Sequence, residues 1–143
     1  MIREVQPEDY AVVARLWREL LNVPAATDER VGRTLNRMAQ DDRYRTFVAV
    51  EDGAAVGFIT LVEVLSIDDP DGYIKMNGIA VLPEYQGRGI GRQLIERAER
   101  EARERGANSV GCATSFGRTG SQALLAELGY ERSAYWFHKV LHK

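Results

Sequence analysis

Residues 77–91, NGIAVLPEYQGRGIG, decide the fold of this chain of 143 residues. The first part of the stretch continues an apolar run that predicts a strand, and the last part places glycine at every second position, Gly87, Gly89 and Gly91. Because glycine lacks Cβ, the backbone can bend so that several N–H groups face one point. A helix that begins there adds the partial positive charge of its N-terminus. We therefore expect residues 86–91 to bind an anion.

Two arginines support an anion at this loop. Arg88 and Arg92 lie in or next to the predicted first helical turn, where the helix dipole disfavours each cation by about 0.3–1 kcal/mol. A bound phosphate would reverse the sign of that interaction. The alternative is a plain strand-to-helix turn in which both arginines are solvated surface charges.

The spacing of the glycines excludes two familiar phosphate loops. The dinucleotide fingerprint Gly-x-Gly-x-x-Gly would need glycine in place of Arg92 or Leu94. The nucleoside triphosphate loop needs Gly-Lys followed by Ser or Thr, and the chain has no such tripeptide. NAD and ATP are therefore not the expected ligands.

Strand and helix patterns alternate outward from this stretch along the whole chain. Asp52-Gly53 between two β-branched runs predicts a tight hairpin, and residues 67–72 predict a wider turn. The predicted strands lie at residues 2–5, 46–50, 54–65, 73–81, 109–115 and 135–141, and the predicted helices at about residues 7–21, 28–38, 89–105 and 121–128. This order predicts an α/β fold with mixed strand pairing.

The longest predicted helix is amphipathic. Its inner face carries apolar residues four apart, namely Ile90, Leu94, Ala98 and Ala102. Its outer face carries Glu–Arg pairs at i,i+4, such as Glu101 with Arg105, each worth about 0.2–0.5 kcal/mol. Gly106 is placed to end the helix.

The composition fits one domain of ordinary size. Apolar residues make up 45% of the chain, and 19 basic against 21 acidic residues give a formal charge of −2. This balance argues against a nucleic-acid partner, which usually selects a basic excess. No run approaches the ~20 apolar residues that cross a membrane. We expect a single soluble domain spanning residues 1–143.

The cysteine and histidine content bears on redox state and metals. Cys112 is the single cysteine, so the chain forms no intramolecular disulfide, and its opening residues show no signal-peptide pattern. A cytoplasmic location is therefore expected. His138 and His142 lie far along the sequence from Cys112, so no metal site is predicted.

The loop and its flanks resemble motif A of the GNAT superfamily of acyl-CoA-dependent N-acetyltransferases. The signature of that family is Gln/Arg-x-x-Gly-x-Gly/Ala, which here is Gln86, Gly89 and Gly91. A strand and the run Pro83-Glu84-Tyr85 precede it, and Leu128-Gly129-Tyr130 closes a short helix downstream. The resemblance covers about residues 73–130.

The resemblance implies a fold and a cofactor. The fold is a central mixed, mostly antiparallel sheet of six to seven strands with about four helices, its strands splayed beside the loop. The donor is acetyl-CoA, whose pyrophosphate binds the loop amides and whose pantetheine arm and thioester carbonyl bind main-chain groups of the preceding strand. The implied cofactor-binding residues are Ile79, Ala80, Val81, Gln86, Gly87, Arg88, Gly89, Ile90, Gly91 and Arg92.

Two departures from the family concern the general acid. The tyrosine that often protonates the leaving thiolate corresponds to Leu125, and the asparagine that commonly precedes its helix corresponds to Arg118. A thiol with a pKa near 8.5 leaves tolerably without help, although a general acid can contribute about 10²–10⁴-fold. Tyr135, Tyr85 or a bound water are the candidate substitutes, and Tyr135 is our first choice.

An unprotonated amine must attack the thioester, so a carboxylate that accepts its proton is expected near the acyl site. Glu63 is the first candidate, and the alternative is a solvated residue on a strand face. Asn77 occupies a position where some relatives carry a glutamate. Asp68, Asp69 and Asp71 either attract a cationic amine or serve as turn formers, while Cys112 and His138 are read as a core residue and a strand-surface residue.

The resulting functional hypothesis is an acyltransferase that moves an acetyl group from acetyl-CoA to a primary amine by direct attack in a ternary complex. The alternative is a CoA-binding regulatory or partner module with lost or weak turnover. The acceptor is a small-molecule or peptide amine that the sequence does not identify. The resemblance also implies a homodimer formed through the C-terminal strands.

Overall fold

The computed structural model describes residues 1–114 and 119–142. The chain divides into two compact units, Met1–Cys112 and Ala113–Lys143. The expectation of a single domain over residues 1–143 stays a prediction.

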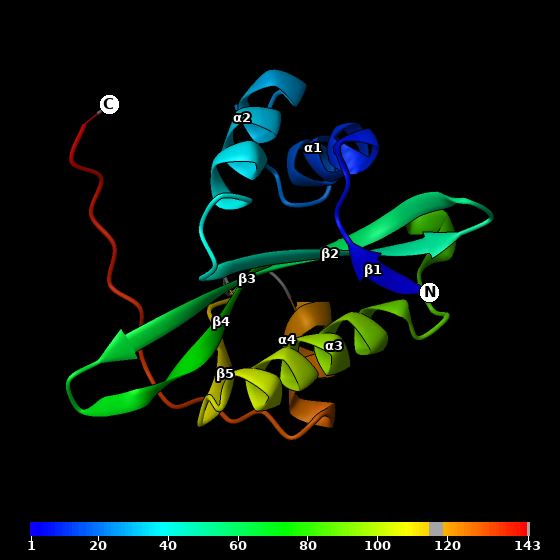
Figure 1. Ribbon diagram of the computed structural model, residues 1–143. Helices are drawn as coiled ribbons and strands as arrows, with labels where there is room; N and C mark the ends of the chain where they lie inside the picture. Colours follow the sequence, from blue (N-terminus) through cyan, green and yellow to red (C-terminus); the bar gives the residue numbers. More distant parts are fainter. Residues whose placement is uncertain (115–118, 143) are drawn as a thin grey trace. The chain divides into compact units, whose positions relative to one another are not determined.

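The first unit is built on one mixed sheet with the strand order β1-β2-β3-β4-β5 (Figure 1). Neighbours among the first four strands are antiparallel, and β5 runs parallel to β4. The strands are β1 (Ile2–Glu4), β2 (Tyr44–Glu51), β3 (Ala54–Ser66), β4 (Asp69–Val81) and β5 (Ser109–Cys112). In the part of the chain that the structure describes, the sheet therefore has five strands, and the expected number of six to seven was wrong.

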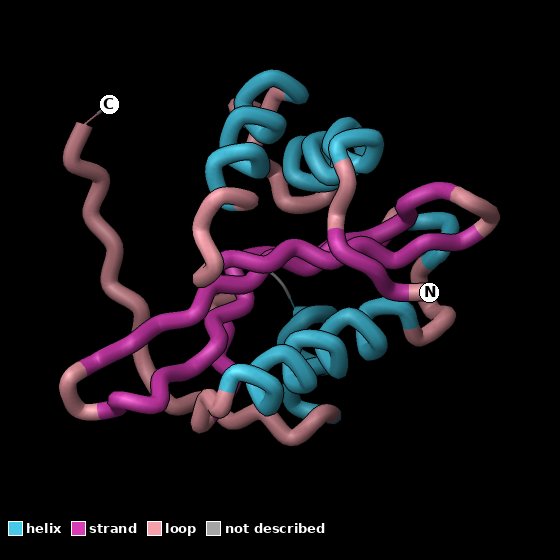
Figure 2. The backbone as a smooth tube through the Cα atoms, in the orientation of Figure 1, coloured by secondary structure: helices cyan, strands magenta, loops and turns pink. Residues whose placement is uncertain are grey.

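Two hairpins join the long strands and extend toward opposite ends of the sheet (Figure 2). Asp52 and Gly53 both have positive φ, 52° and 79°, as a tight two-residue turn requires, which confirms the hairpin predicted there. The β3–β4 hairpin is tighter than the predicted turn at residues 67–72, because Ser66 already pairs with Asp69.

Three helices cover the two faces of this sheet (Figure 1). α1 (Tyr10–Glu19), which follows the 3₁₀ turn η1 (Pro7–Asp9), and α2 (Asp28–Met38) lie on one face, and α3 (Ile90–Arg105) lies on the other. The Thr27 hydroxyl accepts a hydrogen bond from the N–H of Arg30 and so caps α2. Gly106, at φ 73°, ends α3 as predicted.

The core has a layer on each side of the sheet. On the α1 face, Leu16 and Phe58 are fully buried, and the Trp17 ring contacts Phe58 at a centroid distance of 5.7 Å. On the α3 face, the predicted inner stripe is confirmed, since Ile90, Leu94, Ala98 and Ala102 are at most 4% exposed. Glu101 was expected on the outer face, yet it is only 5% exposed.

The second unit contains α4 (Thr119–Glu127) and the segment that follows it. Gly129, at φ 92°, follows the end of α4. The strand predicted at residues 135–141 does not form, because an alternating pattern becomes a strand only where another segment pairs with it. Its large apolar side chains are 65–91% exposed, namely Tyr135, Trp136, Phe137, Val140 and Leu141. In the part of the chain that the structure describes, no helix is both long and apolar enough to cross a membrane.

Candidate functional site

The glycine loop connects β4 to α3 through the 3₁₀ turn η2 (Pro83–Tyr85). Gly87 and Gly89 have φ values of 79° and 80°, and a Cβ added at either would meet nothing within 4 Å. These glycines are therefore needed for their left-handed backbone and not for space. Gly89 is the residue immediately before α3.

The N–H groups from Gly87 to Gly91 have no partners within the described residues, whereas the Gln86 N–H, which was also expected to face the anion, donates to the Pro83 carbonyl at 3.2 Å. None of the N–H groups from Gly87 to Gly91 donates a hydrogen bond to a carbonyl or a side chain there. The Arg88 guanidinium lies over the Tyr85 ring at 4.8 Å from its centroid and donates to the carbonyl of Glu84 at 3.2 Å. A left-handed loop with unpaired donors, a helix N-terminus and a fixed cation has the chemistry of a phosphate site.

β4 extends beyond its pairing with β5. The β4–β5 ladder runs from Tyr73 opposite Ser109 to Met76 opposite Cys112, whereas β4 continues to Val81. Among the described residues, the pairing of β4 with β5 therefore ends at Met76, before residues 77–81 approach the loop. The expected splay of the two strands stays a prediction.

The hydrogen-bond alternation shows which main-chain groups face the open edge of β4. The Leu82 N–H donates to the Val56 carbonyl at 2.8 Å, and the register continues without a break to Thr60 opposite Gly78. Because hydrogen-bonded and non-bonded pairs alternate in an antiparallel ladder, Ile79 and Val81 direct their N–H and C=O groups away from β3. By the same alternation, Ala80 uses its main-chain groups to pair with Phe58.

The Gln86 side chain joins the loop to the strand. Its Nε2 donates a hydrogen bond to the Val81 carbonyl at 2.9 Å. One side chain therefore sets the position of the loop donors relative to the free groups of Ile79. The sequence placed Gln86 in the loop but gave no signal for this contact, because it depends on where the strand ends.

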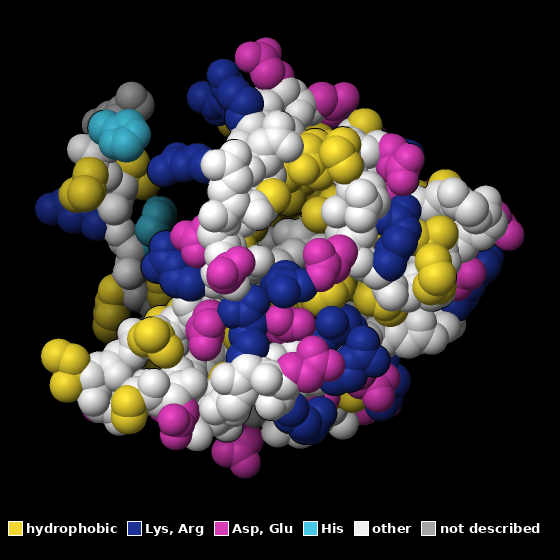
Figure 3. Space-filling model, viewed as in Figure 1, with side chains coloured by type: hydrophobic (Ala, Val, Ile, Leu, Met, Phe, Trp, Pro, Cys, Tyr) yellow, Lys and Arg dark blue, Asp and Glu magenta, His cyan; other side chains and the backbone are white. Residues whose placement is uncertain are grey.

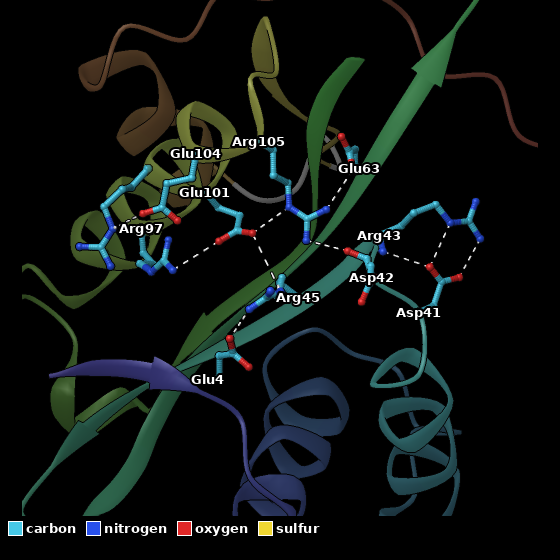
Figure 4. A network of polar contacts seen from close by, with 11 residues as sticks. Glu4, Asp41, Asp42, Arg43, Arg45, Glu63, Arg97, Glu101, Glu104 and Arg105 are labelled. Atoms are coloured by element: carbon cyan, nitrogen blue, oxygen red, sulfur yellow. Dashed lines mark hydrogen bonds and ion pairs between the residues drawn. The ribbon is translucent and has the colours of Figure 1, made fainter. Parts of the chain in front are cut away.

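The predicted base, Glu63, lies in an ion cluster between the sheet and the C-terminal end of α3 (Figure 4). Its carboxylate accepts from Arg105 at 2.9 Å, and Arg105 also donates to the carbonyl of Asp42. Glu63 stands opposite Ile74, five residues along β4 from Ile79, which corresponds to about 16 Å of strand. Its catalytic role stays a prediction, and its contacts in the structure are those of an ion pair.

Glu101 is the buried centre of this cluster. Its carboxylate contacts Arg105 at 2.8 Å, Arg97 at 3.3 Å and Arg45 at 4.0 Å. Burial by itself raises the pKa of Glu101, but the hydrogen bond and charge of Arg105, with the charges of Arg45 and Arg97, outweigh it and hold the pKa below its usual value. The carboxylate is therefore held ionised by its neighbours.

The remaining candidates are distributed over both units. Tyr135 belongs to the second unit and is 87% exposed. Leu125 lies within α4, and Arg118 lies outside the described residues. The Tyr85 hydroxyl is 3.4 Å from the carboxylate of Asp52.

The acidic turn between β3 and β4 is engaged in local contacts. Asp68 accepts a hydrogen bond from Ser66, which lowers the pKa of that carboxyl, and Asp69 accepts one from Asn108. These contacts match the reading of the aspartates as turn formers. Across residues 1–114 and 119–142, no three His, Cys, Asp or Glu side chains gather as a metal site would need.

Charged side chains of both signs are interspersed over α3 and the adjacent strands on the face shown in Figure 3. Several of them form ion pairs along α3, including Arg97 with Glu101 and Arg100 with Glu104. This face therefore presents charges of both signs, and the absence of a nucleic-acid partner stays a prediction.

Comparison with known proteins adds relatives of known activity. An aminoalkylphosphonate N-acetyltransferase of Salmonella typhimurium is 29% identical over 144 residues, 98% of this chain and 90% of that protein. An aminoglycoside N(6')-acetyltransferase type 1 of the same species is 31% identical over 97 residues, 66% of this chain and 67% of that protein. The crystal structure of aminoglycoside N-acetyltransferase AAC(6')-Iy in complex with CoA has a TM-score of 0.84 at 25% identity, covering 99% of this chain and 95% of that one.

A family model described as "Acetyltransferase (GNAT) family" matches residues 10–130. The matched range contains α1, the open edge of β4, the glycine loop and α3. The chain thus belongs to the acetyltransferase (GNAT) family.

Proposed function

We propose that this acetyltransferase moves the acetyl group of acetyl-CoA to a primary amine by direct attack in a ternary complex. The observation that carries the proposal is the continuity of two sets of unpaired main-chain groups. One set is the loop N–H groups from Gly87 to Gly91, and the other is the edge of β4 at Ile79 and Val81, which no other described strand pairs with. Gln86 links the two sets.

The residues present fit this donor. The loop N–H groups and the N-terminus of α3 bind the diphosphate, and Arg88 adds a positive charge beside it. The N–H and C=O of Ile79 and the N–H of Val81 pair with the amide groups of the pantetheine arm as a neighbouring strand would. Bound acetyl-CoA supplies a thioester whose carbonyl carbon is the electrophile. A main-chain N–H at this edge donates to the thioester oxygen and stabilises the charge that develops there during attack.

Ala80 and Arg92 have smaller parts in this proposal than the sequence assigned to them. Ala80 pairs with Phe58, so it contributes the packing that holds the edge in place. Arg92 lies in the first turn of α3, where its positive charge adds to that of the helix N-terminus.

Tyr135 and Glu63 are the two first-choice candidates for proton transfer that the sequence offers. Tyr135 carries a phenol hydroxyl, which is chemically able to donate a proton to a leaving thiolate. Glu63 is engaged with Arg105 and can accept a proton from the amine only through water or after that ion pair opens. We therefore propose Tyr135 as the general acid, with replacement by Phe expected to lower kcat by about 10²-fold or more.

The acceptor is proposed as a small-molecule or peptide primary amine. The relatives carry names with different acceptors, an aminoalkylphosphonate and an aminoglycoside, so family membership does not choose between them. We also propose a homodimer, supported by the exposed apolar side chains of residues 135–141, and a cytoplasmic location, supported by the single cysteine.

The test combines calorimetry with a turnover assay. We expect CoA to bind in a calorimetric titration and thiol release from acetyl-CoA to accelerate with at least one amine of a panel of amino sugars, aminophosphonates, polyamines and peptides. The absence of CoA binding at high micromolar concentration contradicts the proposal. Binding without release for every amine supports the alternative, a CoA-binding regulatory or partner module, which the presence of Leu125 at the usual acid position favours.

A further inference from the structure

β4 has an irregularity immediately before Ile79. Thr60 stands opposite Gly78 and Leu61 opposite Met76, so Asn77 has no opposite residue in β3. An extra residue of this kind bends a strand and changes the direction of its following groups. The direction in which Ile79 presents its N–H and C=O is therefore set by how the chain is held at Asn77 and Gly78.

A tryptophan from α1 lies directly on this irregularity. A Cβ built on Gly78 would be 2.5 Å from Cζ2 and 2.7 Å from Cη2 of Trp17, closer than real Cβ contacts. The ring is itself held against Phe58. Glycine within a strand weakens it unless another group approaches the backbone closely, and Trp17 is that group here.

The strand needs this support because, within residues 1–114 and 119–142, it is paired at Gly78 on one edge alone. At Gly78, β3 supplies Thr60, whose hydroxyl shares a buried 2.9 Å hydrogen bond with Thr46, while the β5 ladder has already ended at Met76. The β3 edge fixes the strand within the sheet plane. The Trp17 ring, which lies on the α1 face, limits the movement of β4 out of the sheet plane.

We propose that Trp17 is a positioning residue for the acyl donor. Its ring, seated on Gly78, holds the bend of β4 so that the main-chain groups of Ile79 meet the pantetheine arm and the thioester oxygen. The inference rests on the proposed function. It assigns Trp17 no contact with the glycine loop, so the loop keeps its own affinity for phosphate when Trp17 is disturbed.

Because Trp17 acts on the β4 edge and not on the glycine loop, the test compares two ligands. Acetyl-CoA spans both the loop and the β4 edge, whereas adenosine 3'-phosphate 5'-diphosphate, the nucleotide half of CoA, reaches the loop alone. We expect Gly78→Ala to weaken acetyl-CoA binding by about ten-fold or more, because the added Cβ displaces the strand beside Ile79. Binding of the nucleotide, measured by the same calorimetry, stays unchanged.

Two further variants complete the experiment: one makes the ring at position 17 smaller, and the other is a matched control. In Gly78→Ala combined with Trp17→Phe, the smaller ring leaves space for the Cβ, and we expect most of the acetyl-CoA affinity to return. Gly111→Ala is the control, since a Cβ added at this strand glycine meets nothing closer than ring atoms of Tyr73 at 3.8 Å. We expect its affinities for acetyl-CoA and for the nucleotide to stay at the wild-type values. If Gly78→Ala does not fold, Trp17→Phe alone must weaken acetyl-CoA and spare the nucleotide.

Fluorescence gives an independent readout, because Trp17 and Trp136 are the two tryptophans of the chain. In a Trp136→Phe background, acetyl-CoA changes the Trp17 emission and the nucleotide does not. Equal weakening of both ligands by Gly78→Ala, or unchanged acetyl-CoA affinity, overturns the inference while the proposed function stands. Failure of the wild-type protein to bind acetyl-CoA overturns both.

Discussion

At the scale of single residues, the two glycines that flank α3 have the same left-handed backbone conformation but different roles. Gly89 and Gly106 have φ values of 80° and 73°, and neither has an atom within 4 Å of where a Cβ would lie. Alanine at either position meets the same left-handed strain, about 1–2 kcal/mol. Only Gly89 adjoins the unpaired N–H groups of the loop.

This pair predicts a separation of stability from binding. We expect Gly89→Ala and Gly106→Ala to lower the free energy of unfolding by similar amounts, about 1 kcal/mol, measured by urea titration. Gly89→Ala also weakens CoA binding, because relief of the strain rotates the loop N–H groups, whereas Gly106→Ala leaves CoA affinity unchanged. Equal CoA affinity in the two variants would argue against a phosphate site at this loop.

Glu63 supplies a second prediction. We expect Glu63→Gln to lower the free energy of unfolding, because Arg105 loses a charged partner at 2.9 Å, and to leave the pH profile of kcat/KM unchanged in shape. Unfolding by urea and turnover from pH 6 to 9 measure the two effects. Loss of the acidic limb of the pH profile in this variant would instead identify Glu63 as the base.

At the scale of elements, α3 is attached to the sheet by charge as well as by its apolar stripe. Arg97, Arg105 and Arg45 converge on Glu101, and the cluster extends to Glu63 and Glu4 (Figure 4). Arg97 also lies 4.1 Å over the Phe47 ring, so the ring face contacts a guanidinium whose Nη1 has no hydrogen-bond partner among the described residues.

The cluster predicts a pH-dependent stability. The folded pKa of Glu101 is below its usual value of 4.5, so its contribution is present above that pH and is lost as the pH falls through the folded pKa. We expect the urea midpoint of the wild-type protein to drop more steeply below pH 5 than that of Glu101→Gln. At pH 7 the substitution costs about 1.5–3 kcal/mol.

Glu104→Gln is the matched control for this measurement. Glu104 lies on the same helix and pairs with Arg100 at 3.5 Å, but its side chain is 57% exposed. We expect a loss of at most about 0.5 kcal/mol and an unchanged pH dependence. A similar response of the two glutamines would show that burial of Glu101 has no energetic role.

The elements also show which features the sequence determines locally. The Asp52-Gly53 hairpin and the α3 stripe each depend on residues within one turn or one helix, and both predictions are confirmed. The burial of Glu101 was missed because one of its partners, Arg45, lies far away in the sequence. The strand at residues 135–141 was wrongly predicted because an alternating pattern shows only that a segment can form a strand. The pattern does not show that another segment lies beside it to pair with.

The candidate site likewise combines features that the local sequence predicts with features that depend on the whole fold. The left-handed glycines could be predicted from their spacing, and the free edge of β4 from the family resemblance. The contact of Gln86 with Val81 and the seat of Trp17 on Gly78 could not, because each joins two elements whose distance is set by the whole sheet.

At the scale of the whole molecule, the C-terminal segment exposes several large apolar side chains that the fold does not explain. Tyr135, Phe137 and Leu141 are each at least 86% exposed within seven residues. Monomeric proteins seldom leave apolar side chains together in water, and such patches mark interaction sites. A second copy of the chain is the occupant that the proposed homodimer supplies.

This surface predicts the oligomeric state. We expect light scattering after size exclusion to give twice the mass of the 16.1 kDa chain at micromolar concentration, and Phe137→Ser with Leu141→Ser to give the monomer. Leu65→Ser, at an exposed apolar residue near the end of β3, is the control and leaves the mass unchanged. A monomeric wild-type protein would remove the homodimer from the proposal.

The open edge of β4 has a consequence for inhibition. The groups that Ile79 and Val81 offer there belong to the peptide backbone, and every amino acid except proline carries both of them. An inhibitor that pairs with this edge tolerates most side-chain substitutions there, because exchanging a side chain does not delete the contact. We expect loss of inhibitor binding at sites where substitution moves the backbone itself, and Gly78→Ala is expected to weaken the inhibitor and acetyl-CoA together.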